Sequence, residues 1–218
     1  MATGALDARQ LAVQRGRRLE YVTVGWNSLE ALASIVAGIL AGSIALVGFG
    51  LDSVIETTSG SAMLWRLHHR HERNAASRER AERIALRIIG VSFLALAVYV
   101  AVDAVHSLWT KEAPHESIPG IVIAILSLIA MPLLARAKRK VAATLNSGAL
   151  HADSRQTDIC AYLSAILLGG LVLNAMFGWW WADPFAGLAM APIIAHEGFQ
   201  ALRGESCECE SECSEICK

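Results

Sequence analysis

Two acidic residues interrupt an apolar stretch in the first quarter of the chain. Asp52 and Glu56 are four residues apart, with apolar residues on both sides. In a helix this spacing puts both carboxylates on one face, one turn apart. Two anions in a low dielectric repel each other unless a proton or a cation lies between them. The pair predicts a site that binds a divalent metal ion at one moment and protons at another. The alternative is a pair that faces a water-filled crevice or the cytoplasmic end.

A second polar cluster opens a later apolar segment. His151, Ser154 and Asp158 recur at i, i+3 and i+7, so they share one helical face, while Asp153 lies to one side. Imidazole, hydroxyl and carboxylate groups are ligands for divalent ions. We expect this face to complete a four-ligand metal site with the acidic pair, and we expect Asp158, which is deeper, to be a ligand.

The first residues of this cluster have a second interpretation. His151 and Asp153 could lie at the cytoplasmic mouth of the site, with Arg155 pairing to Asp153. The fourth metal ligand therefore stays open between Ser154, His151, Asp153 and water.

Other polar residues stand within or beside apolar segments. Asn27 and Glu30 are predicted to lie beside the same crevice as supporting groups. Asp183 precedes Pro184, a pattern typical of a helix N-cap followed by proline at the first helical position. We expect Glu197, near the inner end of its segment, to be solvated.

Four cysteines are concentrated at the C-terminal end. Cys207, Cys209, Cys213 and Cys217 alternate with glutamates. In the cytoplasm these thiols stay reduced, and four thiolates can wrap a soft ion such as zinc, cadmium or Cu(I). We favour a metal-collecting tail; the alternative is a disordered acidic tail with incidental thiols. Cys160 is expected to be a small buried core residue.

The composition says which kind of element must position these groups. Hydrophobic residues make up 54% of the 218 residues, charged residues 18%, and the mean hydropathy is +0.42. A typical soluble domain is about 25% charged. These values exclude a disordered chain, a secreted disulfide scaffold and a large soluble enzyme. No nucleophile–base pair or phosphate-binding loop points to an enzyme, and no strongly basic surface remains for nucleic acid.

Six apolar segments are long enough to cross a membrane, which takes roughly 20 residues. Open strands could not satisfy their backbone in lipid, so the prediction is an all-α membrane protein with six transmembrane helices. Gly38 and Gly42 are expected to form a close-packing face in the first helix. The predicted spans are Val22–Ala41, Ile44–Leu67, Ile84–Trp109, Ile118–Ala135, Ala149–Phe177 and Trp180–Leu202.

The distribution of Lys and Arg predicts the orientation. The N-terminal arm, the second and fourth loops and the segment after the last span are basic, whereas the alternate loops hold almost no cation. The positive-inside rule therefore puts both termini in the cytoplasm. The expected organisation is a basic arm over residues 1–20, a transmembrane domain over 21–203 and an acidic Cys-rich tail over 204–218. No cleavage site follows a short apolar core, so we expect the first span to be retained and not a signal peptide.

These features together resemble the cation diffusion facilitators. The resemblance rests on six spans, the sequence from Gly42 to Val47 that leads into Asp52-xxx-Glu56, and the polar start of the fifth span. It implies a six-helix cation-efflux bundle that moves divalent metal out of the cytoplasm, usually as a homodimer and in exchange for protons. Carried over by position, the metal ligands are Asp52, Glu56, Ser154 and Asp158.

This chain departs from the familiar pattern of that family in three ways. The zinc-selective pairs are His-xxx-Asp, whereas the pairs here are oxygen-rich, which weakens the case for zinc over manganese or iron. Serine stands at one ligand position. The resemblance does not extend to the family's cytoplasmic metal-sensing domain, so we expect a short form of the family.

The sequence therefore predicts a multi-pass transporter of the plasma membrane that exports zinc or a related ion (manganese, iron, cobalt or cadmium) by metal/proton antiport. The metal is its substrate, and no prosthetic group is expected. The alternative is a membrane protein that senses or buffers metal through its cysteine tail without transport.

Overall fold

The computed structural model describes residues 2–68, 75–111, 114–145 and 148–203, and this part of the chain is helical without strands. The prediction of six helices is confirmed, and most of the predicted boundaries lie within a few residues of the observed ones. The helices are α1 (Ala2–Ala41), α2 (Ile44–His68), α3 (Ala75–Thr110), α4 (Ile118–Leu145), α5 (Gly148–Phe177) and α6 (Ala182–Arg203).

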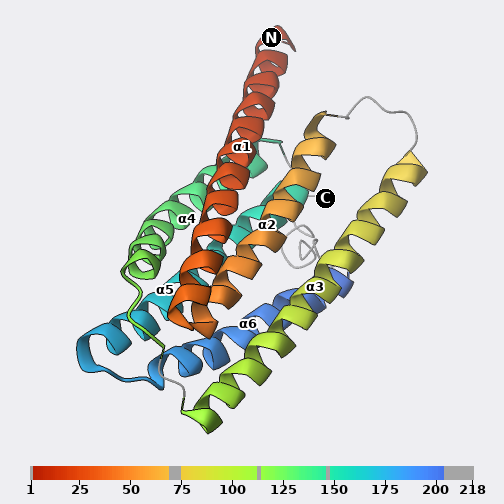
Figure 1. Ribbon diagram of the computed structural model, residues 1–218. Coiled ribbons are helices and arrows are strands. Elements are labelled where there is room, and N and C mark those ends of the chain that lie inside the picture. The colour runs from red at the N-terminus through yellow and green to blue at the C-terminus, as the bar shows by residue number, and fades with distance from the viewer. Residues whose placement is uncertain (1, 69–74, 112–113, 146–147, 204–218) are drawn as a thin grey trace, which may run out of the picture.

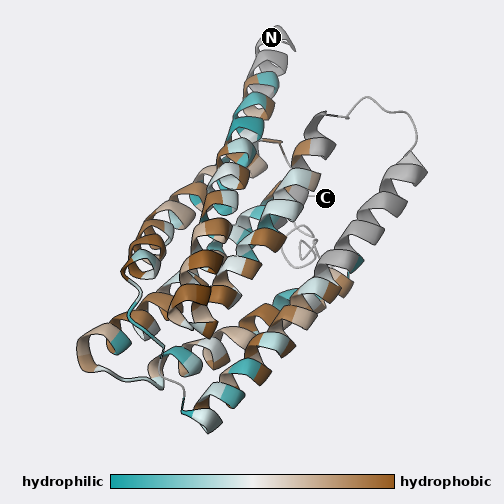
Figure 2. Cartoon of the chain, in the orientation of Figure 1, coloured by the Kyte–Doolittle hydropathy of each residue, from teal (hydrophilic) through white to brown (hydrophobic). Residues whose placement is uncertain are grey.

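The largest difference from the predicted spans is at the first helix. α1 runs without interruption from Ala2, so the predicted arm over residues 1–20 is continuous with the apolar segment that follows it. Figure 2 shows hydrophilic residues gathered toward the N-terminal end of this helix. α4 likewise continues beyond its apolar part, through a basic segment to Leu145. Both helices therefore extend past the length that a bilayer core needs.

Four described helices are long and apolar enough to cross a membrane: the segments Gln10–Ala41, Gly90–Thr110, Ile118–Leu145 and Asp153–Phe177. α2 and α6 do not reach that hydropathy. α2 carries the two carboxylates together with many small and hydroxyl residues, and α6 has acidic residues near both of its ends. Both helices nevertheless have the length of a span, at 25 and 22 residues.

The helices pack in pairs. α1 lies along α2, α3 along α6 and α4 along α5, as Figure 1 shows, while α4 also packs on α1 and α5 on α6. The main apolar core takes side chains from all six helices and includes Phe49, Leu163 and Met190. A smaller cluster joins the N-terminal half of α1 to the end of α4 and the start of α5. α2 is thus enclosed by other helices, and this position brings its acidic face inside the bundle.

The turn between α1 and α2 is held by a residue from the far end of the chain. Gly42 adopts φ = 66°, which a residue without a Cβ accepts readily. Ser43 then caps α2, since its Oγ accepts the Leu46 N–H at 3.1 Å. Asp183 accepts the Ser43 hydroxyl at 2.5 Å and the Ile44 N–H at 3.0 Å. Asp183 was predicted to cap its own helix, α6; instead its carboxylate caps α2 and ties α6 to it.

Glycines let α1 and α2 approach closely, although not in the predicted pair. A Cβ added to Gly38 would lie 2.8 Å from the Val47 backbone nitrogen, and one added to Gly50 would lie 2.9 Å from the Ile35 nitrogen. Gly42, in contrast, has open space around its Cα. Gly38 therefore packs closely as expected, but its partner in this role is Gly50 of the neighbouring helix, and Gly42 makes the turn.

Candidate functional site

The acidic pair of α2 faces a small cavity inside the bundle. Asp52 and Glu56 lie one turn apart with only 6% and 4% of their surfaces exposed. The cavity between α2, α3, α5 and α6 has a volume of about 10 Å³, close to the size of one water molecule. Its lining consists of Asp52, Glu56, Phe93, Gln156, Ile159, Leu163, Ile194 and Glu197.

Glu56 has the most unusual surroundings of these residues. Both of its carboxylate oxygens are buried and have no hydrogen-bond partner among the described protein atoms. A buried carboxylate without a partner is costly unless it takes up a proton or binds a cation. Asp52, one turn away, adds a second carboxylate to the same cavity. The cavity can therefore bind either a proton or a small oxygen-coordinated cation.

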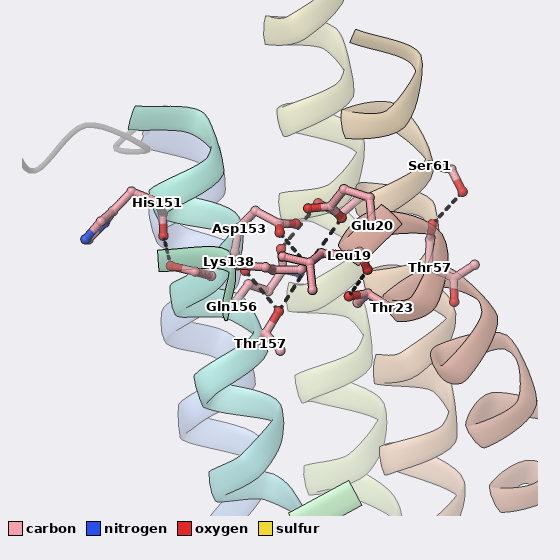
Figure 3. Close-up of polar contacts among 12 residues, drawn as sticks. Leu19, Glu20, Thr23, Thr57, Ser61, Lys138, His151, Asp153, Gln156 and Thr157 are labelled. Atoms are coloured by element: carbon pink, nitrogen blue, oxygen red, sulfur yellow. Dashed lines mark hydrogen bonds and ion pairs between the residues drawn. The ribbon is translucent and has the colours of Figure 1, made fainter. Parts of the chain in front are cut away.

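α5 faces this cavity with different residues from those that the sequence pattern singled out. Gln156 lines the cavity, and its Oε1 accepts a hydrogen bond from Ser59 Oγ of α2 at 3.3 Å. Ser154 is buried, but its hydroxyl donates to the backbone oxygen of His151 at 2.6 Å. His151 is exposed and points away from the neighbouring polar cluster in Figure 3.

The two aspartates of α5 form ion pairs with α4. Asp153 accepts a bond from Lys138 Nζ at 2.5 Å. Asp158 is partly exposed and pairs with Arg139. Neither residue lines the cavity in this arrangement of the helices. Their role as metal ligands, like that of Ser154 and His151, stays a prediction.

Sequence reasoning missed a buried charge cluster around Lys138. This lysine of α4 has no exposed surface and lies 3.3 Å from Glu20 of α1, besides its contacts with Asp153 and Thr157 of α5. Figure 3 shows these side chains converging from three helices. Lys138 was counted only among the basic residues that set orientation. The helical spacing could have shown that Lys138 is buried, since Ala135, Lys138 and Ala142 occupy one buried face of α4.

Glu197 of α6 is a second residue whose position the sequence did not reveal. It was expected to be solvated, but it is partly buried and lines the same cavity as Asp52 and Glu56. The helical register of α6 gives the reason, because Met190, Ile194 and Glu197 follow one another along the face that meets α2. Three carboxylates from two helices therefore surround this cavity.

The two residues of α1 that were predicted to support the site are buried in the bundle, but neither lines the cavity, so their supporting role stays a prediction. Asn27 has no exposed surface, and Glu30 has 2%. Glu30 accepts hydrogen bonds from Ser53 Oγ of α2, at 2.9 Å, and from Ser127 Oγ of α4. This carboxyl group thus joins three helices next to the α2 acidic pair.

Within the described ranges, no three His, Cys, Asp or Glu side chains lie close enough together to hold one metal ion. The predicted tail ligands Cys207, Cys209, Cys213 and Cys217 lie outside the described residues. Cys160 is buried in the core, as expected.

Comparison with known proteins gives a consistent result. Residues 21–205 match the family described as the cation efflux transmembrane domain. The chain is 28% identical over 191 residues to Transmembrane protein 163 of Xenopus laevis, covering 85% of this chain and 67% of that protein. It is 22% identical to the cation-efflux pump FieF of Citrobacter koseri, covering 81% and 61%.

A third relative has a more informative name. The cadmium, cobalt and zinc/H(+)-K(+) antiporter of Bacillus velezensis is 25% identical over 131 residues, covering 57% of this chain and 40% of that protein. The chain therefore spans about two thirds of the frog protein and less than two thirds of these two bacterial relatives.

Proposed function

The chain belongs to the cation efflux family, and from this premise we propose that it exports divalent transition-metal ions, with zinc as the first candidate, from the cytoplasm in exchange for protons. The observation that carries the proposal is the buried Asp52–Glu56 pair, whose cavity holds the unpartnered carboxylate of Glu56. A metal ion that binds these groups must displace their protons, and this competition gives antiport a physical basis.

The choice of metal rests on two supports. Oxygen ligands from Asp52, Glu56 and Gln156 accept zinc, manganese, iron or cobalt. One relative is named as a cadmium, cobalt and zinc/H(+)-K(+) antiporter. Zinc and cobalt are common to both, and we take zinc as the first of the two to test. We further propose that the protein works as a homodimer in the plasma membrane.

The role of α5 in the cargo site follows from the same argument. Asp158 and Ser154 are proposed as ligands in a state in which α5 turns toward α2 and Asp158 exchanges Arg139 for the metal. In the arrangement described above, Gln156 is the α5 residue that faces the pair.

The proposal can be tested in cells that lack their own zinc exporters. Expression of the chain should lower cellular zinc, measured by mass spectrometry, and Asp52→Asn should abolish that effect at equal expression. Removal of residues 205–218 should change the concentration dependence but leave export in place. If this deletion alone abolished the effect while Asp52→Asn had none, a metal buffer that acts through the cysteine tail would replace the transporter.

A further inference from the structure

A stripe of buried polar residues runs along α1. Glu20, Thr23, Asn27, Glu30 and Ser34 are spaced alternately by three and four residues, so they share one helical face. Each has 2% or less of its surface exposed. At 1.5 Å per residue the stripe extends over about 21 Å, most of the roughly 30 Å of a bilayer core. Polar groups at such positions are costly in a span and mark functional paths.

Glu30 lies in the middle of this stripe and contacts the two helices that pack on α1. Ser53 of α2 and Ser127 of α4 donate hydrogen bonds to its two carboxylate oxygens. Ser127 in turn accepts a bond from Trp26 Nε1 at 3.3 Å. No Lys, Arg or His of the described residues forms an ion pair with Glu30. An ionised Glu30 would therefore carry a buried charge that only hydrogen bonds from neutral side chains stabilise.

Several buried polar atoms elsewhere in the stripe lack a hydrogen-bond partner. Both amide atoms of Asn27, the hydroxyl of Ser34 and one carboxylate oxygen of Glu20 are buried without a hydrogen-bond partner among the described protein atoms. Buried polar atoms in native structures are nearly always paired, so a group of unpaired ones in one stripe calls for an explanation. A path along which protons pass would use such atoms as donors and acceptors in turn.

The charged groups around Glu30 connect it to the cargo cavity. Glu56 and Asp52 of α2 and the thiol of Cys160 on α5 interact with it electrostatically. On α4 the residue that contacts it is Ser127, and the buried cation of that helix, Lys138, pairs with Glu20 and Asp153. Ser53 contacts Glu30 and is the neighbour of Asp52 in the sequence. The positive charge of a metal ion at the acidic pair would therefore lie near Glu30 and favour its charged form. Metal binding and proton release would then be coupled.

We propose that Glu30 carries a counter-transported proton at a site on α1 that is separate from the metal cavity, in addition to any proton that the metal displaces from the acidic pair. The inference rests on the proposed exchange of metal for protons. The carboxylate of Glu30 takes up one proton, an O–H bond forms at one of its oxygens, and the proton leaves when metal occupies the α2 pair. A proton suits this place because serine hydroxyls donate to both carboxylate oxygens and Glu30 is not among the residues that line the cavity.

The test uses the full chain in liposomes that contain a zinc indicator, with imposed pH gradients. At zero membrane potential, each proton exchanged per zinc ion changes the zinc ratio at equilibrium tenfold for each pH unit of gradient. In Glu30→Gln we expect the number of protons exchanged per zinc ion to fall by one. Zinc should still bind at the acidic pair, but with lower affinity than in wild type, because the coupling between zinc and the charged form of residue 30 is reciprocal. Glu116→Gln, the same change at an exposed position, is the matched control and should keep the wild-type slope.

Two further variants keep the test decisive if Glu30→Gln folds poorly. Glu30→Asp keeps a carboxyl group and should keep the slope. Ser127→Ala removes one donor to the carboxylate and should displace the pH profile of zinc flux by at least half a pH unit without changing the slope.

Four results would contradict the inference in different ways. If the equilibrium zinc ratio of Glu30→Gln depended on the pH gradient as steeply as that of wild type, the proton would bind elsewhere. Loss of zinc binding together with the slope would make Glu30 part of the metal site. Zinc flux that follows a potassium or sodium gradient in wild type, but not in Glu30→Gln, would assign the site to an alkali cation. No slope in wild type, with zinc flux intact, would overturn the proposed antiport itself.

Discussion

Lys138 and Glu56 illustrate two ways in which this protein accommodates a buried charge. Lys138 has no exposed surface, yet carboxylates from α1 and α5 and the hydroxyl of Thr157 surround its ammonium group. Glu56 is almost as deeply buried, and neither of its carboxylate oxygens accepts a hydrogen bond from the described residues, although the charge of Lys138 acts on it from a distance. The first arrangement holds three helices together, and the second leaves a carboxylate free to bind a cargo ion or a proton.

Removal of Lys138 should therefore affect stability. Lys138→Met leaves Glu20 and Asp153 buried without their cation, and breaking a buried pair in this way costs about 3–5 kcal/mol. We expect a clear fall in the thermal midpoint of the detergent-solubilised protein. Neutralising the partners as well, in Lys138→Met with Glu20→Gln and Asp153→Asn, should recover most of the loss. An unchanged midpoint in the single variant would mean that the cluster does not hold the helices together.

Asp158 allows a test of whether its ion pair or a metal contact matters. As a ligand, Asp158 should be essential while its partner is not: Asp158→Asn should abolish zinc flux, and Arg139→Gln should retain it or increase the apparent affinity. The pair is partly exposed, so its loss should cost about 1 kcal/mol of stability or less in either variant. Equal effects of the two substitutions on flux would indicate a purely structural ion pair.

At the scale of elements, the close contact between α1 and α2 depends on glycine. Gly38→Ala would place a Cβ 2.8 Å from the Val47 backbone nitrogen, which cannot move independently of its helix. We expect a loss of roughly 1–3 kcal/mol, the usual cost of overpacking. Gly169→Ala in α5 meets nothing within 4 Å and should be neutral or stabilising by up to about 1 kcal/mol. Thermal midpoints of the two variants in detergent test this directly, and equal midpoints would contradict the packing argument.

The helices themselves followed from the sequence much better than their faces did. Long apolar runs bounded by charge gave six helices, because hydropathy reports what lipid and core require of a whole segment. The face that each residue occupies depends on how helices rotate against one another, which no single segment encodes. For this reason Asp52 and Glu56 were found from their spacing alone, whereas Lys138, Gln156 and Glu197 were not recognised. Asp183 was identified as a cap, but only the packing of α6 on α2 shows which helix it caps.

At the scale of the whole molecule, the bundle separates two polar regions. The cavity of the acidic pair lies between α2, α3, α5 and α6, and the α1 stripe lies where α1 meets α2 and α4. α2 borders both regions. Its neighbouring residues Asp52 and Ser53 face different ones: Asp52 lines the cavity, and Ser53 contacts the α1 stripe. This arrangement suits an exchanger, because two ions can influence each other through one helix without sharing a site.

The predicted orientation of the molecule can be tested by labelling. With both termini in the cytoplasm, the turn before α4 lies outside the cell. In a background without native cysteines, Glu116→Cys should react with an impermeant maleimide in intact cells, and Leu11→Cys only after permeabilisation; both positions are exposed. The opposite pattern would reverse the direction of transport as well as the topology.

The most direct test of the central claim is zinc transport by the purified chain in liposomes with an internal zinc indicator. An imposed pH gradient should drive zinc across the membrane in wild type, and Asp52→Asn should reduce the flux to that of protein-free liposomes while leaving the folded, monodisperse protein intact. Zinc flux in Asp52→Asn equal to wild type would contradict the assignment of the acidic pair as the cargo site.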